Sequence, residues 1–485
     1  MPRYAITTFG CQMNVHDSER MREVLRGAGY AEAEDSASAD VLVLNTCSVR
    51  EKAEQKLRSE VGRLARWKRE QPERVLIVAG CVAQQEGEQL LRRMPAIDGV
   101  IGPDNIAELP RLLGDLSTGG LPAVRTVFDL DAPRFLPPPR GGSGPTAFVT
   151  VMKGCNERCS FCIVPYTRGP ERYRASDEIV AEIAALCASG TREVTLLGQT
   201  VNSYRDPLRA LSQAPGADPE DPDESEFAAL LRRIAAEVPA LRRLRYTSPH
   251  PRHLTPSLIR AHAELPLLPR HVHLPVQSGA NRMLKRMIRR YTREEYLART
   301  RALCAEAPGM TLSTDIIVGF PGETEEDFEA TLSLVEEVGF RGLFGFKYSR
   351  RPYTPALKLP DDVTEQVKSA RLTRLFALSE ALLGKHLEGL TGSVQEVLVE
   401  GPAKAGDLWS GRTGRNEIVH IEGASELDLT GEVVTAHILR ANKHSLHGAL
   451  TEAARAAARQ PRARAQGSQA RRALPVVNEG PRAEG

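Results

Sequence analysis

The chain has 485 residues, of which 41% are apolar and 26% charged, enough for about two to four domains with cores of their own. No run approaches the roughly 20 apolar residues that cross a bilayer, and the first residues lack the basic and long apolar regions of a signal peptide, so we expect a cytoplasmic protein. The net charge of +2 includes a basic tail with seven Arg against three Glu, so overall charge gives no argument for a nucleic-acid partner.

Strand and helix patterns alternate over the first 115 residues. Short apolar runs rich in β-branched residues are followed by amphipathic helical patterns. The strand patterns occupy residues 3–10, 40–46 and 74–80, and the helical patterns occupy residues 18–29 and 50–67. This alternation predicts a parallel, doubly wound α/β sheet.

A cysteine follows each of these three apolar runs, at Cys11, Cys47 and Cys81. Ligands of open α/β sheets collect at the carboxyl ends of the strands, so the three side chains can converge on one point. Alternatively, three small residues pack at strand ends, because free cysteine is among the residue types most often buried. The same position in three successive units favours a cluster of ligands.

Residues 116–146 are dense in Gly and Pro and predict a linker. From Ala147 to about Ser349 a second alternation contains six strand patterns, which predict a partial (β/α)6 barrel with its site at the carboxyl ends of the strands. The strand patterns are residues 147–153, 193–201, 242–248, 271–276, 312–320 and 342–348. Residues 205–226, rich in Pro and acidic side chains, predict an exposed insertion.

Three further cysteines, Cys155, Cys159 and Cys162, lie in the loop after the first barrel strand, with no fourth cysteine nearby. Reducing compartments disfavour disulfides, so metal or redox chemistry is the better interpretation. Three thiolates can hold three irons of a four-iron cluster and leave the fourth open to S-adenosylmethionine, whose reduction gives a 5′-deoxyadenosyl radical. A zinc site completed by a later histidine is disfavoured, because zinc motifs usually come as paired short spacings.

The remaining two cysteines, Cys187 and Cys304, lie in apolar helical patterns and are expected in the core. Gln199 and Asn202 follow the second barrel strand and are candidates for polar contacts with S-adenosylmethionine.

A turn with Gly319, Pro321 and Gly322 follows the fifth strand. It could shape a backbone approach to S-adenosylmethionine, although an ordinary strand-to-helix turn has the same residues.

Two further groups have open interpretations. His271 and His273 alternate along a strand, and we expect one of them to face the barrel interior. Three arginines around Tyr291 could bind phosphate or could form a solvated helix face. They are Arg286, Arg289 and Arg290.

After a helical stretch at residues 369–392, alternating strands with Gly turns predict a small antiparallel β-barrel. Residues 387–450 carry nine acidic residues against five Lys or Arg, so RNA contact would need the basic residues gathered on one face. These residues are Arg412, Arg415, Arg440 and Lys443. The tail beyond the barrel has no aromatic residue and is expected to be disordered.

These patterns divide the chain into five predicted segments. They are an N-terminal sheet domain at 1–117, a linker at 118–146, the barrel core at 147–373, a helix with the small barrel at 374–450, and the disordered tail at 451–485.

Eight motifs, in this order along residues 1–450, resemble those of the radical S-adenosylmethionine methylthiotransferase family. They read GCQMNVHDSERM, LNTCSVREKAEQK, VAGCVAQQ, GCNERCSFCIVPYTRGPERYR, LLGQTVNSY, SPHPRHLT, HLPVQSGANRMLKRMIRRYTREEY and TDIIVGFPGETEEDF. The resemblance implies two [4Fe-4S] clusters: an auxiliary cluster on Cys11, Cys47 and Cys81, and a second cluster, exchangeable with S-adenosylmethionine, on the other set. It also implies that the C-terminal barrel is an RNA-binding TRAM domain.

The motifs around the cysteines are most similar to those of members that act on tRNA. This implies methylthiolation at C2 of N6-isopentenyladenosine next to the anticodon, with one S-adenosylmethionine supplying the methyl group and a second the radical. Expected partners are the tRNA anticodon loop, an electron donor and a sulfur or iron–sulfur donor protein, for a monomer without membrane association. Alternatives are threonylcarbamoyladenosine in tRNA, a ribosomal protein aspartate, or a nonenzymatic iron–sulfur RNA-binding regulator.

Overall fold

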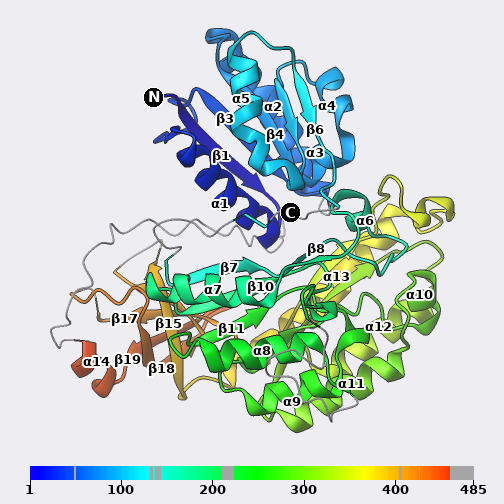
Figure 1. The fold of residues 1–485 in the computed structure, drawn as a ribbon. Coiled ribbons are helices and arrows are strands. Elements are labelled where there is room, and N and C mark those ends of the chain that lie inside the picture. Colours follow the sequence, from blue (N-terminus) through cyan, green and yellow to red (C-terminus); the bar gives the residue numbers. More distant parts are fainter. Residues whose placement is uncertain are drawn as a thin grey trace.

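The chain forms an N-terminal sheet domain, a central domain with two short sheets and a C-terminal barrel, coloured from blue to red in Figure 1. This computed structural model describes residues 1–48, 51–130, 135–136, 144–209, 223–403, 407–424 and 426–458. Much of the predicted insertion, at 210–222, and most of the tail, at 459–485, lie outside the described residues. The first residues of the tail form helix α14, Glu452–Ala458.

The N-terminal sheet has six strands, and every pairing in it is parallel, as predicted. In spatial order they are β2 (Ala31–Glu32), β1 (Arg3–Phe9), β3 (Val41–Thr46), β4 (Val75–Gly80), β5 (Gly99–Ile101) and β6 (Ala123–Arg125). Strand β6 therefore adds to the sheet from within the segment predicted as a linker.

Helices cover both faces of this sheet, which explains why its central strands are continuously apolar. Leu76 and Val78 of β4 pack with α2 on one face, while Ile77 and Ala79 pack with α1 and α5 on the other. The helices are α1 (Gln12–Gly27), α2 (Glu51–Glu70), α3 (Cys81–Glu86), α4 (Glu88–Arg93), the 3-10 helix η1 (Pro103–Glu108) and α5 (Leu109–Ser117).

The central domain contains all six predicted strands, arranged as two parallel three-stranded sheets that form a partial barrel. The first sheet has the order β11 (Arg243–Tyr246), β10 (Glu193–Leu197) and β7 (Thr146–Thr150). The second has the order β12 (His271–His273), β13 (Thr311–Val318) and β14 (Gly342–Lys347). One apolar core joins side chains of both sheets.

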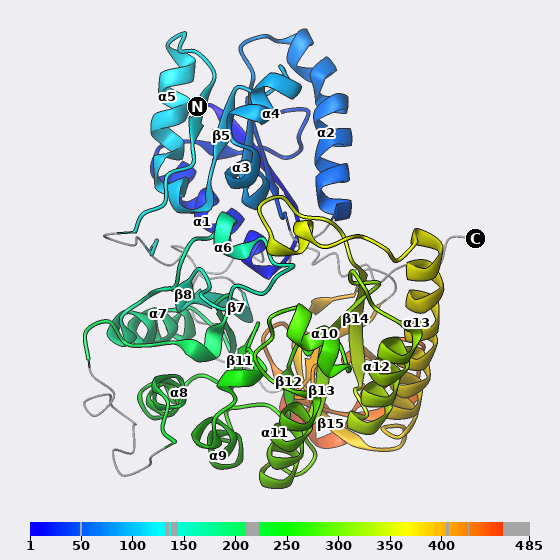
Figure 2. The ribbon, with the colours of Figure 1, turned by 90° about the vertical axis from the view of Figure 1, so that its right-hand side faces the viewer.

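Helices line the outside of the two sheets (Figures 1 and 2). They are α7 (Ser176–Ala188), α8 (Glu226–Glu237), α9 (Pro256–Glu264), α10 (Asn281–Arg286), α11 (Arg293–Glu306), α12 (Glu325–Val338) and α13 (Glu365–Glu388). Thr292 and Thr324 start α11 and α12 with capping boxes, completed by Glu295 and Asp327.

Short elements lie at the carboxyl ends of the barrel strands. They are β8 (Met152–Lys153), α6 (Val164–Thr167), β9 (Arg172–Tyr173) and the 3-10 helices η2 (Val201–Ser203), η4 (Pro251–His253) and η5 (Pro355–Lys358). In the part of the chain that the structure describes, no helix has the length and apolar character needed to cross a bilayer.

The C-terminal domain is a closed five-stranded barrel. Its strands, in order around the barrel, are β15 (Val394–Pro402), β16 (Trp409–Thr413), β17 (Ile418–Glu422), β19 (Leu446–Leu450) and β18 (Val433–Ala441). Four pairings are antiparallel, as predicted, whereas β17 and β19 pair in parallel.

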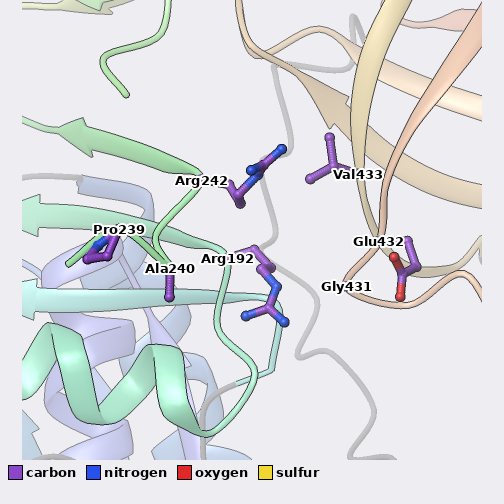
Figure 3. A pocket seen from close by; sticks show the side chains of 7 residues that line it. All are labelled: Arg192, Pro239, Ala240, Arg242, Gly431, Glu432 and Val433. Carbon is purple, nitrogen blue, oxygen red and sulfur yellow. The ribbon is translucent and has the colours of Figure 1, made fainter. Parts of the chain in front are cut away.

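The barrel docks at the amino ends of β10 and β11. Arg243 donates to the carbonyl of Arg412 at 2.8 Å, and Arg245 donates to the carbonyl of Thr413 at 3.0 Å. A cavity of about 390 Å³ lies at this junction. It is lined by Arg192, Pro239, Ala240, Arg242, Gly431, Glu432 and Val433 (Figure 3).

A buried ion network joins the N-terminal domain to the central domain. Arg20 of α1 donates to Glu182 of α7 at 2.5 Å, and Arg174 pairs with the other oxygen of the same carboxylate. His16 of α1 contacts the hydroxyl of Thr150 at the end of β7, at 3.3 Å. Because Glu182 pairs with two buried guanidinium groups from different domains, it fixes the orientation of one domain on the other.

We expect Glu182→Ala to lower the free energy of unfolding by about 3–5 kcal/mol, because it removes the buried carboxylate that two buried guanidinium groups share. Glu178→Ala provides a matched control. It lies on the same helix and pairs with the same Arg174, at 3.1 Å, but its side chain is 59% exposed. That substitution should cost less than about 1 kcal/mol. Urea titration of both variants measures the difference, and equal losses of stability would contradict the role given to Glu182.

Candidate metal centres

The first cysteine set lies at the carboxyl edge of the N-terminal sheet, after three strands that are neighbours in space. Cys11 caps α1 after β1, Cys47 follows β3, and Cys81 begins α3 after β4. Gly10 has a φ of +153° and lies so close to Cys47 that an added Cβ would stand 2.5 Å from the cysteine Cβ. Glycine at this position therefore permits the close approach of the two chains.

These three thiols interact with one another and with a guanidinium from the other domain. A hydrogen bond with Cys47 lowers the pKa of Cys11 to about 6, whereas burial raises the pKa of Cys81. The Nε of Arg168 donates to the sulfur of Cys81 at 3.2 Å, and its Nη2 donates to Asp17 at 2.6 Å. Arg168 is only 5% exposed. The structure thus brings together the three cysteines that the sequence analysis selected.

The second set lies in a loop at the carboxyl end of β7. The antiparallel pair of β8 and β9 closes this loop, and the amide of Cys155 donates to the carbonyl of Gly169 at 3.1 Å. Gly154 has a φ of +79°, and a side chain there would collide with the carbonyl of Pro170. The glycine before the first cysteine is therefore required by the narrow base of the loop.

The sulfurs of this second set also lie near one another. Burial raises the pKa of Cys155 to about 11 and that of Cys162 to about 12, and the charge of Cys159 adds to both shifts. The hydroxyl of Thr200 lies 2.8 Å from the sulfur of Cys155. Arg289 is 5% exposed and donates through Nη1 to the sulfur of Cys159 at 3.3 Å.

The residues of both sets fit an iron–sulfur cluster. All eight cysteines of the chain are free thiols, and within each set the thiols lie close enough to affect one another's pKa. Burial disfavours the thiolate form of Cys155, Cys162 and Cys81, and coordination to a cation would offset that penalty. Each set also has one buried arginine whose N–H meets a sulfur, the kind of hydrogen bond that tunes protein-bound clusters.

The two candidate amides play different parts at the mouth of the barrel. Asn202 binds the backbone of His250 at both ends, donating to its carbonyl at 3.0 Å and accepting from its amide at 2.7 Å. Gln199 accepts a hydrogen bond from the amide of Gly154, while its buried Nε2 has no partner among the described residues. Gln199 therefore keeps a donor for a ligand, whereas both polar atoms of the Asn202 amide already hold the loop.

The turn after β13 satisfies its own backbone. Gly319 and Gly322 have φ values of +69° and +78°. The amide of Gly319 donates to Glu323 at 2.6 Å, the amide of Gly322 donates to an Asp362 oxygen at 2.6 Å, and the carbonyl of Pro321 accepts from Arg286 at 3.1 Å. The positive φ values and these contacts explain why glycine occupies both positions, and no ligand is needed to explain it. Contact of this turn with S-adenosylmethionine therefore stays a prediction.

The expectation that one of two strand histidines faces the barrel interior was wrong. Residues two positions apart share a face of a strand, and both rings contact side chains on the same face of β13. His271 meets the hydroxyl of Thr311 at 3.1 Å, and His273 meets that of Ser313 at 2.9 Å.

The arginines near Tyr291 do not share a helix face, because α10 ends at Arg286 and Arg290 has a φ of +57°. Arg289 turns inward to Cys159, as described above. Cys187 is buried as expected, but Cys304 is exposed, because the buried side of α11 runs through other residues.

Two of the four basic residues considered for RNA binding are already paired with carboxylates. Arg412 pairs with Glu400 at 3.1 Å, and Lys443 pairs with Glu380 at 3.0 Å. Pairing leaves these cations less available to phosphate, so the C-terminal barrel has little free positive charge at these positions.

Sequence reasoning missed a third group, near Cys159. Glu157, His250 and His253 present donor atoms within 4.8 Å of one another. Guanidinium groups of Arg252 and Arg290 both lie 3.9 Å from the Glu157 carboxylate. A bound cation would meet two positive charges there, so the group is better explained as an ion network that supports the cysteine loop.

Comparisons with known proteins agree with this division of the chain. Residues 3–102 match an uncharacterized protein family, UPF0004; residues 149–335 match the Radical SAM superfamily; and residues 389–451 match the TRAM domain. A solved radical S-adenosylmethionine methyltransferase, TsrM from Kitasatospora setae, has a TM-score of 0.50 and 16% identity over 73% of this chain and 74% of its own. This likeness shows the fold alone.

Closer relatives share most of their length with this chain. A tRNA-2-methylthio-N(6)-dimethylallyladenosine synthase of Sorangium cellulosum (strain So ce56) is 76% identical, with 98% of this chain and 99% of the relative covered. Proteins of the same name from Geobacter metallireducens and Bordetella pertussis are 46% and 45% identical, covering 92% and 91% of this chain and 97% of each relative.

A partial barrel with three cysteines in the loop after its first strand, together with the match to the superfamily, defines a radical S-adenosylmethionine protein. Its extra N-terminal sheet, which carries Cys11, Cys47 and Cys81, and its C-terminal barrel narrow this class of protein to one family. The chain belongs to the family of tRNA-2-methylthio-N(6)-dimethylallyladenosine synthases.

Proposed function

We propose that this protein methylthiolates C2 of N6-dimethylallyladenosine (isopentenyladenosine) in tRNA. One observation carries the proposal: two sets of three cysteines face the same junction between two domains, where Arg168 reaches from the loop of one set to Cys81 of the other. A reaction that inserts sulfur at an unactivated carbon needs a radical source and a sulfur source side by side. The relatives named above, which align along nearly the whole chain, support this substrate.

Cys155, Cys159 and Cys162 would hold the cluster that binds S-adenosylmethionine, and Cys11, Cys47 and Cys81 would hold the auxiliary cluster. When bound, these groups supply the radical, the sulfur and the methyl group of the reaction. The protein binds and shields them. Arg289 and Arg168 each donate an N–H to one cysteine sulfur, and the buried position of both arginines excludes water from that side.

Among the predicted S-adenosylmethionine contacts, Gln199 has the strongest support, because its buried Nε2 lies at the barrel mouth without a partner in the described part of the chain. Asn202 would act indirectly by holding the His250 backbone. Gly319, Pro321 and Gly322 remain part of the proposed S-adenosylmethionine site, because the shape of their turn would allow the backbone to approach the ligand.

The proposal predicts a strong preference for tRNA that already carries the dimethylallyl group. A pocket for this apolar group should favour modified tRNA by at least about tenfold, since one methylene in such a pocket gives about 1–3 kcal/mol. Purified tRNA with and without the group, incubated with the reconstituted enzyme, allows rates of 2-methylthio formation to be compared by nucleoside mass spectrometry.

Three outcomes would contradict this substrate. Equal rates on both tRNAs would show that the dimethylallyl group is not recognised. Thiolation only of tRNA bearing threonylcarbamoyladenosine would assign the chain to a different substrate. Product on a ribosomal protein aspartate and none on tRNA would place the activity on protein.

The same proposal includes the partners and the setting of the enzyme. The tRNA anticodon loop is the RNA element that presents the modified adenosine, and unpaired loop bases are accessible to a site between two domains. An electron donor and a sulfur or iron–sulfur donor protein would complete the cycle. We also propose that the protein works in the cytoplasm as a monomer.

A further inference from the structure

Two exposed tyrosines stand together beside the cysteine sets. Tyr166 and Tyr353 are 43% and 58% exposed, and their ring centroids lie 5.9 Å apart with an interplanar angle of 35°. Large aromatic side chains are usually buried, so two exposed tyrosine rings in contact with each other indicate a surface that binds a partner.

Tyr166 lies between the two cysteine sets. It belongs to α6, which begins two residues after Cys162 and ends just before Arg168. Helix α6 packs against α3, whose first residue is Cys81. Figures 1 and 2 both show α6 at the boundary of the N-terminal and central domains.

Tyr353 comes from the loop that follows β14, and this loop is held from two sides. The amide of Ala356 donates to the carbonyl of Ser160, between the second and third barrel cysteines, at 2.8 Å. Arg351 pairs with Glu54 of α2 in the N-terminal domain at 3.1 Å. The loop is therefore fixed to the cysteine loop and to the neighbouring domain, which places its tyrosine at their junction.

The backbone of Tyr353 adopts an unfavourable conformation. Its φ of +68° lies in the left-handed region, where glycine is comfortable and a residue with a bulky side chain is rare. The hydroxyl of Thr354 donates to the carbonyl of Arg351 at 2.8 Å and closes the turn. A strained turn that displays an exposed ring favours a role for the ring in binding, since the ring adds little to the core.

We propose that Tyr166 and Tyr353 form a stacking platform for an unpaired base of the RNA loop, next to the adenosine that enters between the cysteine sets. The inference rests on the proposed function and names how the substrate is held. Aromatic rings stack on any unpaired base, and RNA loops present such bases. Arg350 and Lys358 lie exposed on the same loop as Tyr353 and supply positive charge for the adjoining phosphates.

The test uses the full-length reconstituted protein and an anticodon stem-loop RNA with 2-aminopurine next to the target adenosine. Stacking on a tyrosine quenches 2-aminopurine fluorescence. The variant with both Tyr166→Ala and Tyr353→Ala should bind this RNA about tenfold more weakly and leave the probe bright. The matched variant with both tyrosines changed to Phe should keep both the affinity and the quenching.

Salt dependence separates stacking from charge. The double Ala variant should keep the wild-type slope of affinity against salt, whereas Arg350→Ala with Lys358→Ala should reduce the slope and keep the quenching. Unchanged affinity and quenching in the double Ala variant would overturn the platform, as would a double Phe variant as weak as the Ala variant.

Two further measurements keep these results interpretable. Iron content reports whether the variants fold, and if the double Ala variant loses iron, Tyr353→Gly removes one ring while suiting the backbone of the turn. If the wild-type protein binds the RNA and quenches its 2-aminopurine fluorescence but never methylthiolates any tRNA, the proposed function is refuted and the stacking platform is still supported.

Discussion

Replacing Cys155, Cys159 and Cys162 together by Ala should abolish cleavage of S-adenosylmethionine, while about four of roughly eight iron atoms per chain remain. The reason is that the two sets are separate in the fold: one lies in the loop after β7, the other at the edge of the N-terminal sheet. Loss of the set in the barrel loop removes the site where S-adenosylmethionine would bind and leaves the set of the N-terminal sheet intact.

The chain offers a matched control for this experiment. Cys304 is an exposed cysteine on α11 and belongs to neither set, so Cys304→Ala should keep full iron content and full cleavage. Iron is measured on anaerobically reconstituted protein, and cleavage is measured as release of 5′-deoxyadenosine. Full iron in the triple variant, or continued cleavage by it, would show that the assignment of these cysteines is wrong.

The placement of both cysteine sets could be predicted because local sequence controls it. Continuous apolar runs such as residues 41–44 identify strands that are buried on both faces, and parallel strands place their carboxyl ends at one edge. A cysteine directly after such a run must then lie at that edge. Spacing alone could not show the contacts between the thiols, which depend on the order of the strands.

The arginines that contact the cysteine sulfurs could not be predicted in this way. Arg168 and Arg289 lie far along the sequence from the cysteines that they contact, and no regular spacing connects them. They meet their partners only because separate segments of the chain fold together. Charged side chains usually face solvent, so the sequence favours phosphate binding or a solvated helix face for Arg289 over contact with a buried sulfur. The parallel pairing of β17 with β19 was missed for a related reason, since alternation defines a strand and its faces but not its neighbour.

Replacing Cys11, Cys47 and Cys81 together by Ala should have the complementary effect to the first variant. Release of 5′-deoxyadenosine should continue, because the barrel and its cysteine loop remain complete, and formation of the 2-methylthio nucleoside should stop. About four iron atoms per chain should again remain. Domain orientation should persist as well, because the ion network of Glu182 with Arg20 and Arg174 does not involve these cysteines.

Arg168 allows the position of the loop that follows α6 to be checked in this triple variant. Its guanidinium binds both Cys81 and Asp17, so the triple Ala variant removes the sulfur partner and keeps the carboxylate partner. The loop that follows α6 should therefore stay in place, and affinity for the stem-loop RNA should change little. Continued formation of methylthio product by the triple variant would refute the sulfur-bearing role of this set. Loss of 5′-deoxyadenosine release together with the product would show that the two sets do not act separately.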